Sequence, residues 1–323
     1  MANLILMKIS IAIPVYNSEL TIGILVEQLI EELRPEYDIE IVLVNDHSTD
    51  NTEQVCVSLF EKYPNIIKFY SLAKNVGEHN AIIAALNFVS GDWVIVMDDD
   101  LQNPVSEVKK LIEFALSHSY DVVYTYYTKK YHSLWRNLGS KFNDKMANLI
   151  LNKPKDLYLS SFRAINKKIV REIIKYRYPF TFIDGLILRT TSNIGKIQVQ
   201  HSPRKFGKSH YTFSKLISLW SNMFFNFSLL PIRWTLFCGI FLMFVSFAFI
   251  IIGLWKLTFL LTDIRWLTLI IVMFFAGLFL FFLGIIGEYI GRLFLSLNGH
   301  PQFIISKKFE LNNSSFKSQF DDA

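Results

Sequence analysis

The chain has 323 residues, of which 51% are hydrophobic and 29 are Phe, a composition too apolar for an ordinary, purely soluble protein. Its two cysteines, Cys56 and Cys238, exclude a disulfide framework. The net charge of +5 is unevenly spread: residues 1–128 carry 7 Lys and Arg against 19 Asp and Glu (−12), residues 129–215 carry 19 against 4 (+15), and residues 216–323 carry 7 against 5 (+2).

Short β-branched runs alternate with helical patterns over the first 126 residues. Strands are predicted over Lys8–Ile13, Ile39–Val44, Ile66–Leu72, Trp93–Met97 and Val122–Tyr126. Helices are predicted over Thr21–Arg34, Asn51–Lys62, Gly77–Val89 and Pro104–Leu116, the last with Asn103 as its cap. This alternation is typical of an α/β fold with a doubly wound, mostly parallel sheet.

The chain becomes more helical after the fifth strand, where residues 129–215 form a basic block. Helices are predicted over Tyr131–Leu151 and Lys167–Tyr176. In Thr212–Leu230, apolar side chains share one helical face, which predicts a helix lying on a membrane surface, with packing on the soluble domain as the alternative. Because the basic block precedes apolar stretches, we expect it to face anionic lipid headgroups and not nucleic acid. A merely solvated face is the alternative for its individual lysines.

Two uncharged apolar stretches, Leu236–Trp255 and Trp266–Gly287, are 20 and 22 residues long. At about 1.5 Å per residue each spans roughly 30 Å, the hydrocarbon thickness of a bilayer, whereas buried core helices are usually shorter. The short link Lys256–Arg265 predicts a hairpin with both flanks on one side of the membrane. The first residues form too short an apolar run for a secretory signal, so we expect the N-terminal part in the cytosol, together with a polar, loose tail from Ser306.

Polar clusters follow three of the predicted strands. They are Ile13–Asn17, Asn45–Asp50 and Asp98–Gln102. Because the carboxyl ends of parallel strands meet at one edge of a sheet, these clusters predict a ligand cleft. The adjacent carboxylates of Asp98, Asp99 and Asp100 repel one another unless a cation neutralises them, so a hard divalent metal, Mg²⁺ or Mn²⁺, is expected. The alternative is an acidic loop that caps the helix at Pro104.

Five segments, taken together, characterise the chain. They are Ile13–Asn17, Asn45–Asn51, Asn75–Ala81, Asp98–Pro104 and Gly287–Arg292. With them the chain resembles the polyprenyl-phosphate glycosyltransferases, which include the bactoprenol glucosyltransferases, the undecaprenyl-phosphate aminoarabinose transferases and the dolichyl-phosphate mannose synthases. The resemblance covers nearly the whole chain and implies a GT-A fold, then an interfacial helix and a two-helix transmembrane hairpin. It says little about the sugar.

The resemblance implies a nucleotide-sugar site. That site would consist of Pro14, Tyr16, Asn17, Glu19, Asp46, Lys74, Gly77, Arg204, Lys208 and His210. His210 stands where the related enzymes usually have Lys, so we expect the positive charge over the diphosphate to come from Lys208. Lys74 and Gly77 are also compatible with ordinary loop positions.

By the same resemblance, Asp98 and Asp100 hold the metal and the diphosphate, and Gln102, near the donor sugar, completes the catalytic set. Arg136 and Ser140 are four residues apart on a predicted helix, so both side chains can meet one acceptor phosphate, as in the related enzymes. Pairing of Arg136 with lipid headgroups is the alternative.

Arg163 is the third residue expected at the acceptor phosphate. Many related enzymes have an acidic residue two places before this arginine, whereas this chain has Ser161, which cannot act as a carboxylate. The requirement is mild, because a lipid phosphate is already an anion and needs no strong general base. Asp184 is a candidate for a supporting charge.

The sequence therefore predicts an inverting, metal-dependent transfer of a sugar from a nucleotide sugar, by resemblance UDP-glucose, to a polyprenyl (undecaprenyl) phosphate. The product would serve the modification of cell-envelope glycans such as lipopolysaccharide. The expected location is the bacterial inner membrane, with a cytoplasmic catalytic domain over 1–211, an interfacial helix over 212–231, two transmembrane helices within 232–292 (about 235–255 and 266–287) and a tail over 293–323.

Two other functions are weighed against this one. A processive polysaccharide synthase normally has Q-x-x-R-W before a membrane helix; here Arg233 and Trp234 are present, but Leu230 holds the place of Gln. A membrane scaffold that binds nucleotide sugar without turnover would not need the intact aspartates. The oligomeric state is left open.

Overall fold

The computed structural model describes residues 7–127, 153–154, 157–178, 181–202, 264–298 and 301–311, with seven single positions between 232 and 244. The chain divides into two compact units. One consists of residues 1–212 and 301–323, and the other of residues 213–300.

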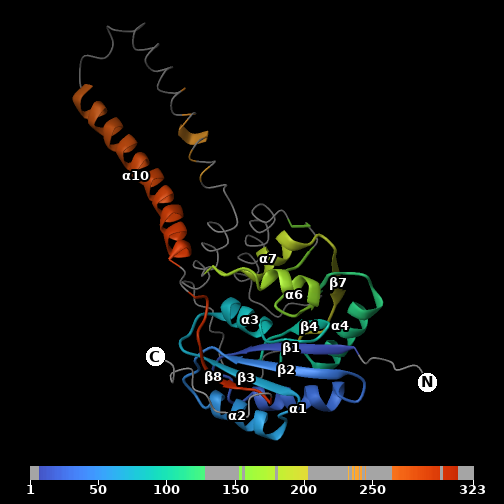
Figure 1. The fold of residues 1–323 in the computed structure, drawn as a ribbon. Helices are drawn as coiled ribbons and strands as arrows, with labels where there is room; N and C mark the ends of the chain where they lie inside the picture. The colour runs from blue at the N-terminus through green and yellow to red at the C-terminus, as the bar shows by residue number, and fades with distance from the viewer. Residues whose placement is uncertain are drawn as a thin grey trace. The chain divides into compact units, whose positions relative to one another are not determined.

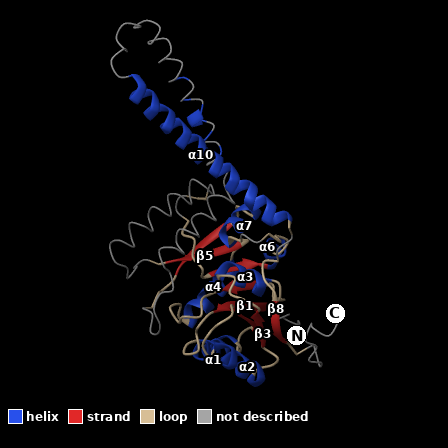
Figure 2. Ribbon diagram, turned by 90° about the vertical axis from the view of Figure 1, so that its left-hand side faces the viewer, coloured by secondary structure: helices blue, strands red, loops and turns tan. Residues whose placement is uncertain are grey.

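An eight-stranded sheet forms the first unit (Figures 1 and 2). Its strands are β1 (Lys8–Val15), β2 (Asp38–Asn45), β3 (Ile67–Leu72), β4 (Trp93–Val96), β5 (Val122–Tyr126), β6 (Arg163–Asn166), β7 (Ile194–Gln198) and β8 (Ile305–Phe309). Their spatial order is β7-β5-β6-β4-β1-β2-β3-β8. β6 and β8 run antiparallel to their neighbours, whereas the other neighbouring pairs are parallel.

Helices cover both faces of this sheet. They are α1 (Ile22–Leu33), α2 (Thr52–Lys62), α3 (Glu78–Leu86), α4 (Val105–Ser117), α6 (Lys167–Ile173) and α7 (Ile183–Thr190). α1 packs against α2 and α4, while α3 packs against β1 and β2. Figure 1 shows α1 and α2 on one side of β1, β2 and β3 and α3 on the other.

The central strands are apolar on both faces because a helix layer covers each face. Every residue of β1 after Lys8 is buried. Ile11 and Ile13, which share one face of β1, belong to the same buried cluster as Leu25 and Leu29 of α1. Each such side chain contributes roughly 1.5–3 kcal/mol by leaving water, so the sheet is a firm base for the loops at its edge.

The mostly parallel α/β sheet is confirmed, and all the strands and helices predicted before residue 127 are present. The expectation of a loose tail from Ser306 is wrong, because Ile305–Phe309 forms β8 and pairs with the edge strand β3. β6, β7 and α7 were not predicted. The first two are only four and five residues long and lack a clear apolar alternation. The helix predicted over Tyr131–Leu151 lies outside the described residues.

The second unit contains α10 (Ile264–Leu297), a helix of 34 residues and about 51 Å. It includes the stretch Gly277–Leu297, the one segment of the described chain that is long and apolar enough to cross a membrane. The helix runs beyond the predicted end at Gly287, and Glu288 and Arg292 form an ion pair of 2.7 Å one turn apart. The described positions between 232 and 244 are helical. The rest of the first apolar stretch and the interfacial helix predicted over 212–231 lie outside the described residues.

Candidate active site

Four loops meet at the edge of the sheet where β1, β2, β3 and β4 end. Each contains one residue with a left-handed backbone: Asn17 (φ 52°), His47 (φ 58°), Gly77 (φ 86°) and Leu101 (φ 59°). Residues other than glycine adopt this conformation at a cost, and it persists where the surrounding structure holds it in place. Among the described residues, all positive φ values lie in these four loops. The strain of the fold is therefore concentrated at the predicted ligand edge.

The loop after β1 is tied to the loop after β2. Asn17 N donates to Ser48 Oγ at 2.9 Å, and Asn17 Oδ1 accepts from Thr49 N at 2.8 Å. Glu19 Oε2 accepts from Asn51 N at 2.9 Å. Two residues predicted to contact the nucleotide thus also fix the shape of their own loops. Of the other predicted nucleotide residues here, Pro14 is buried near the end of β1, and Tyr16, in the loop, is half-buried.

Asp46 ties the loop after β2 to the loop after β3. Its two carboxylate oxygens accept hydrogen bonds from Val76 N at 2.7 Å and Gly77 N at 2.9 Å, and the residue is 4% exposed. The left-handed backbone of Gly77 favours glycine at this turn. Lys74, in the same loop, is exposed. Asp46 therefore supports the predicted nucleotide loops from within.

The three adjacent aspartates after β4 have different partners. Asp99 Oδ2 accepts hydrogen bonds from Tyr16 N at 3.1 Å and from Ser18 Oγ. Asp98 Oδ2 accepts one from Ser161 Oγ at 2.6 Å. The middle aspartate is thus part of the connection to the β1 loop, which sets it apart from Asp98 and Asp100, the residues predicted to bind metal.

The electrostatics of this loop suit a cation. Burial, followed by the charges of Glu78 and Asp100, raises the pKa of Asp98 to about 8. Burial also raises the pKa of Asp99 to about 6, although hydrogen bonds from Ser18 and Tyr16 oppose it. Within the described part of the chain, no three His, Cys, Asp or Glu side chains are grouped closely enough to enclose a metal. Two hard carboxylate ligands still fit Mg²⁺ or Mn²⁺, which commonly take their remaining ligands from substrate phosphates and water.

Gln102 connects this loop to the segment after β7. Its Nε2 donates to Ser202 O at 3.3 Å, and Ser202 N donates to Gln102 O at 2.8 Å. Asp100 Oδ1 accepts from Gln102 N at 3.1 Å. Five predicted site residues lie outside the described residues. They are Arg136, Ser140, Arg204, Lys208 and His210.

Residues 10–174 match the family model described as glycosyl transferase family 2. The chain belongs to this family. It is 32% identical over 93% of its length to undecaprenyl-phosphate 4-deoxy-4-formamido-L-arabinose transferase of Photorhabdus laumondii subsp. laumondii, covering 94% of that protein. The protein of the same name from Pectobacterium atrosepticum is also 32% identical, with 93% of each chain covered. The enzyme class expected from the sequence, a glycosyltransferase, is confirmed.

A solved structure, glucosyl-3-phosphoglycerate synthase from Mycobacterium tuberculosis, superimposes with a TM-score of 0.50 at 16% identity. The likeness covers 67% of this chain and 79% of that chain. At this identity the structural similarity supports the fold alone, and that fold is the expected GT-A fold.

Arg163 of this glycosyltransferase is buried, with 1% exposure, and its guanidinium forms an ion pair with Asp184. Tyr124 OH donates to the same carboxylate oxygen at 2.8 Å. Asp184, named from the sequence as a candidate for a supporting charge, is thus the ion-pair partner of Arg163. Tyr124 and Ser161 contact predicted site residues from distant segments of the chain. Of the two, only the serine at position 161 was noticeable in the sequence.

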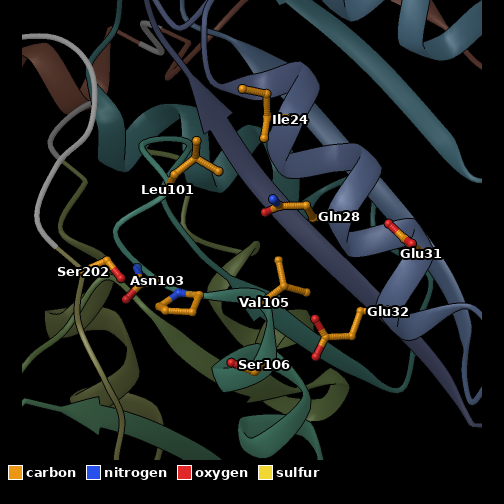
Figure 3. A pocket seen from close by; sticks show the side chains of 10 residues that line it. Ile24, Gln28, Glu31, Glu32, Leu101, Asn103, Val105, Ser106 and Ser202 are labelled. Atoms are coloured by element: carbon orange, nitrogen blue, oxygen red, sulfur yellow. The ribbon is translucent and has the colours of Figure 1, made fainter.

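A cavity of about 770 Å³ lies beside the aspartate loop, between α1 and the start of α4 (Figure 3). Gln28, Glu31 and Glu32 line it from α1, and Leu101 and Ser202 line it next to the site. None of the three aspartates lines this cavity. Its acidic wall does not suit a diphosphate.

Proposed function

We propose that this glycosyltransferase moves a sugar from a nucleotide sugar to undecaprenyl phosphate or a related polyprenyl phosphate. The extent of the likeness to the Photorhabdus relative carries the proposal. An alignment over 93% of the chain has to include the apolar stretches as well as the sheet. An acceptor with a prenyl tail accounts for such stretches, because its phosphate stays at the membrane surface.

The donor would bind at the carboxyl edge of the sheet, on the residues predicted for the nucleotide sugar. Asp98 and Asp100 would hold Mg²⁺ or Mn²⁺ together with the diphosphate, and Gln102 would lie near the sugar. The pKa of Asp98, which burial and then the charges of Glu78 and Asp100 raise, supports this assignment, because a bound cation would stabilise the ionised carboxylate. When bound, the cation stabilises the negative charge of the departing diphosphate.

In the proposed reaction, an oxygen of the lipid phosphate attacks C1 of the sugar in line with the bond to the nucleotide diphosphate. The new C1–O bond forms as the old one breaks, and the configuration at C1 inverts. No proton has to move, since the acceptor arrives and the nucleoside diphosphate leaves as anions. A serine at position 161 is compatible with this reaction.

Arg136 and Ser140 are proposed to bind the acceptor phosphate. Arg136→Ala should then raise the KM for lipid phosphate or lower kcat, with nucleotide-sugar binding unchanged. The reason is the loss of the guanidinium, whose N–H groups can donate two hydrogen bonds to one phosphate. Kinetics in detergent micelles check this. Unchanged lipid kinetics there, with weaker membrane association alone, would contradict the assignment and leave the acceptor phosphate to other residues of the basic block.

UDP-glucose is the first donor proposed, from the family resemblance. Nucleotide-linked 4-deoxy-4-formamido-L-arabinose is the second, from the names of the relatives. A panel of radiolabelled nucleotide sugars, incubated with membranes and undecaprenyl phosphate, tests the proposal. Label in the organic extract is the expected result, and its donor identifies the sugar. Label in an insoluble polymer would favour the processive synthase, and no transfer with any donor would favour the scaffold.

The proposed membrane arrangement is a hairpin of residues about 235–255 and 266–287 in a bacterial inner membrane, with residues 1–211 and the C-terminal segment in the cytosol. α10 would supply the second crossing. Because its length of about 51 Å exceeds the roughly 30 Å of the hydrocarbon core, residues 288–297 would extend past the bilayer. The ion pair of Glu288 and Arg292 would then lie at headgroup level.

A further inference from the structure

Glu53, in the first turn of α2, is the centre of a polar network that the proposed chemistry does not use. Its Oε2 accepts hydrogen bonds from Ser71 Oγ at 2.6 Å and from Asn45 Nδ2 at 3.4 Å. Its Oε1 accepts one from Lys307 Nζ of β8. Asn45 Nδ2 also donates to Ser71 Oγ at 3.1 Å. Asn45 and Ser71 are buried, so the donors of their side chains rely on these contacts and on Glu53 for partners.

The network continues into the loops at the donor edge. Asn45 is the last residue of β2, and its Oδ1 accepts a hydrogen bond from Ser48 N at 3.0 Å. Ser48 Oγ in turn accepts from Asn17 N at 2.9 Å. These contacts hold the segment around the two left-handed residues Asn17 and His47. The Asn45 side chain is therefore held by Glu53 at one end and holds the strained loops at the other.

β8 reaches this network from the far end of the sequence. Ser306 Oγ donates to Ser71 O at 2.9 Å, and Phe309 stacks on Phe69 with ring centroids 5.5 Å apart. Figures 1 and 2 show β8 along the outer side of β3. In the sequence, only residues 298–304 separate β8 from the long apolar helix α10. The segment that follows this helix thus completes the network.

We propose that Glu53 is a positioning residue of the donor site. It fixes Asn45, and through Asn45 the loops after β1 and β2, in the conformation that receives the nucleotide, while Lys307 holds Glu53 in place. The inference rests on the proposed function, since it takes these loops as nucleotide-binding. It goes further because neither Glu53 nor Lys307 is among the residues expected to touch the donor.

A purely structural role for Glu53 makes a different prediction. An acidic residue in the first turn of a helix stabilises the helix weakly through the helix dipole, and an exposed ion pair contributes little. On that account, loss of Glu53 or Lys307 would lower stability slightly and leave the nucleotide affinity of the folded protein unchanged. Nucleotide affinity therefore separates the two roles.

The test uses the full-length protein in detergent, titrated calorimetrically with UDP in the presence of Mg²⁺, with GDP, CDP and TDP in parallel. In Glu53→Ala and in Lys307→Met, the Kd of the nucleotide that the wild type binds should rise about threefold to tenfold, the range of one net hydrogen bond. The KM of the donor should rise with it, while kcat and the KM of lipid phosphate change little. The double variant should lose no more nucleotide affinity than Glu53→Ala alone, because Glu53 and Lys307 act through one network.

Two matched controls should bind the nucleotide as the wild type does. Lys308→Met changes the neighbouring lysine of β8, which pairs with Glu310, and Glu27→Ala removes an acid of α1 that pairs with Lys62. If the wild type binds a nucleotide and both test variants bind it equally well, the inference is wrong and the proposed function stands. If the wild type binds none of the four nucleotides, both are wrong. Should Glu53→Ala not fold, Lys307→Met decides, because Lys307 is exposed.

Discussion

The three consecutive aspartates differ in what holds them. Asp99 is held by Tyr16 N and Ser18 of the loop after β1, and Asp98 by Ser161 of the segment before β6. Asp100 Oδ1 accepts a hydrogen bond from Gln102 N, two residues further along the chain, at 3.1 Å. Asp100→Asn keeps a side-chain oxygen that can accept this bond, so the replacement tests the metal assignment.

Asp100→Asn should lower turnover by about a hundredfold or more, because it removes a charged ligand from the ion that stabilises the leaving group. Steady-state kinetics with saturating donor measure the effect. Asp92→Asn is the matched control, since Asp92 is an exposed acid that precedes the same strand at its other end. Full activity of Asp100→Asn, or of the wild type in excess chelator, would contradict the metal assignment.

The buried pair of Arg163 and Asp184 yields a prediction of stability. Asp184→Ala leaves the guanidinium buried without its partner, so the free energy of unfolding should fall by about 3–5 kcal/mol. Denaturant unfolding in detergent measures it. The double replacement Arg163→Met with Asp184→Leu should recover much of the loss, because no unpaired charge remains. A single variant within about 0.5 kcal/mol of the wild type would contradict this account.

At the residue scale, the positions of the site loops were easier to predict from the sequence than the hydrogen-bond partners of the residues in those loops. The motifs around Asn17, Asp46 and Asp98 do lie at one edge of the sheet. That Asp46 accepts from Val76 N and Gly77 N could not be predicted, because hydrogen-bond partners 30 residues apart depend on how the loops turn in space. Asn103 was expected to cap α4, but its Oδ1 accepts from Tyr127 OH, a residue of a distant segment.

At the scale of elements, strands buried by helices on both faces were predictable because their apolar runs are continuous. β8 was not, since three of its five residues, Ser306, Lys307 and Lys308, are polar and exposed. An edge strand needs only backbone pairing and one apolar anchor, here Phe309, which packs against Phe60 and Phe69. Such a strand has almost no signal in a single sequence.

The amino-terminal halves of β1 and β2 share a buried charge, Glu40, which is 3% exposed. Burial alone would raise its pKa, but hydrogen bonds from Ser10 and Ser90 and the charge of Lys68 outweigh burial and lower the pKa to about 2 from its ordinary 4.5. Because the folded pKa lies below the unfolded one, ionised Glu40 stabilises the fold above about pH 4.5, and this contribution is lost as the pH falls toward 2. At about 1.4 kcal/mol per pKa unit it amounts to roughly 3 kcal/mol.

Glu40→Gln should therefore be less stable than the wild type by up to about 3 kcal/mol at pH 7, and the difference should shrink between pH 4.5 and pH 3. Unfolding curves across this pH range check it. Glu36→Gln, at an exposed acid that pairs with Lys109, should show no such convergence. A difference that stays constant with pH would mean that the charge of Glu40 is not what stabilises the fold.

At the scale of the whole molecule, the order of the units along the chain bears on topology. Residues 1–212 and 301–323 belong to one compact unit, and residues 213–300 lie between them in sequence. If residues 213–300 cross a membrane, both flanks must be on the same side, so the number of crossings is even. The second apolar stretch forms α10, and the first would supply the other crossing.

Single cysteines in a background without Cys56 and Cys238 test this topology. A cysteine at Leu260 should react with an impermeant maleimide applied to intact cells, and one at Ser314 should react only after lysis. Lys and Arg next to membrane helices are enriched on the cytosolic side, and a basic block precedes the proposed hairpin. The reverse pattern would place the catalytic unit outside the cytosol. Labelling at both positions in intact cells would contradict an even number of crossings.

The central claim is transfer of one sugar to a lipid phosphate, and the mass of the lipid product tests it most directly. Purified full-length protein would be incubated with Mg²⁺, a nucleotide sugar, and either undecaprenyl phosphate or undecaprenol. We predict one added sugar on undecaprenyl phosphate, one nucleoside diphosphate released for each lipid consumed, and no product with undecaprenol. Sugar on undecaprenol, several sugars on one lipid, or no lipid product with any donor of the panel would contradict the claim.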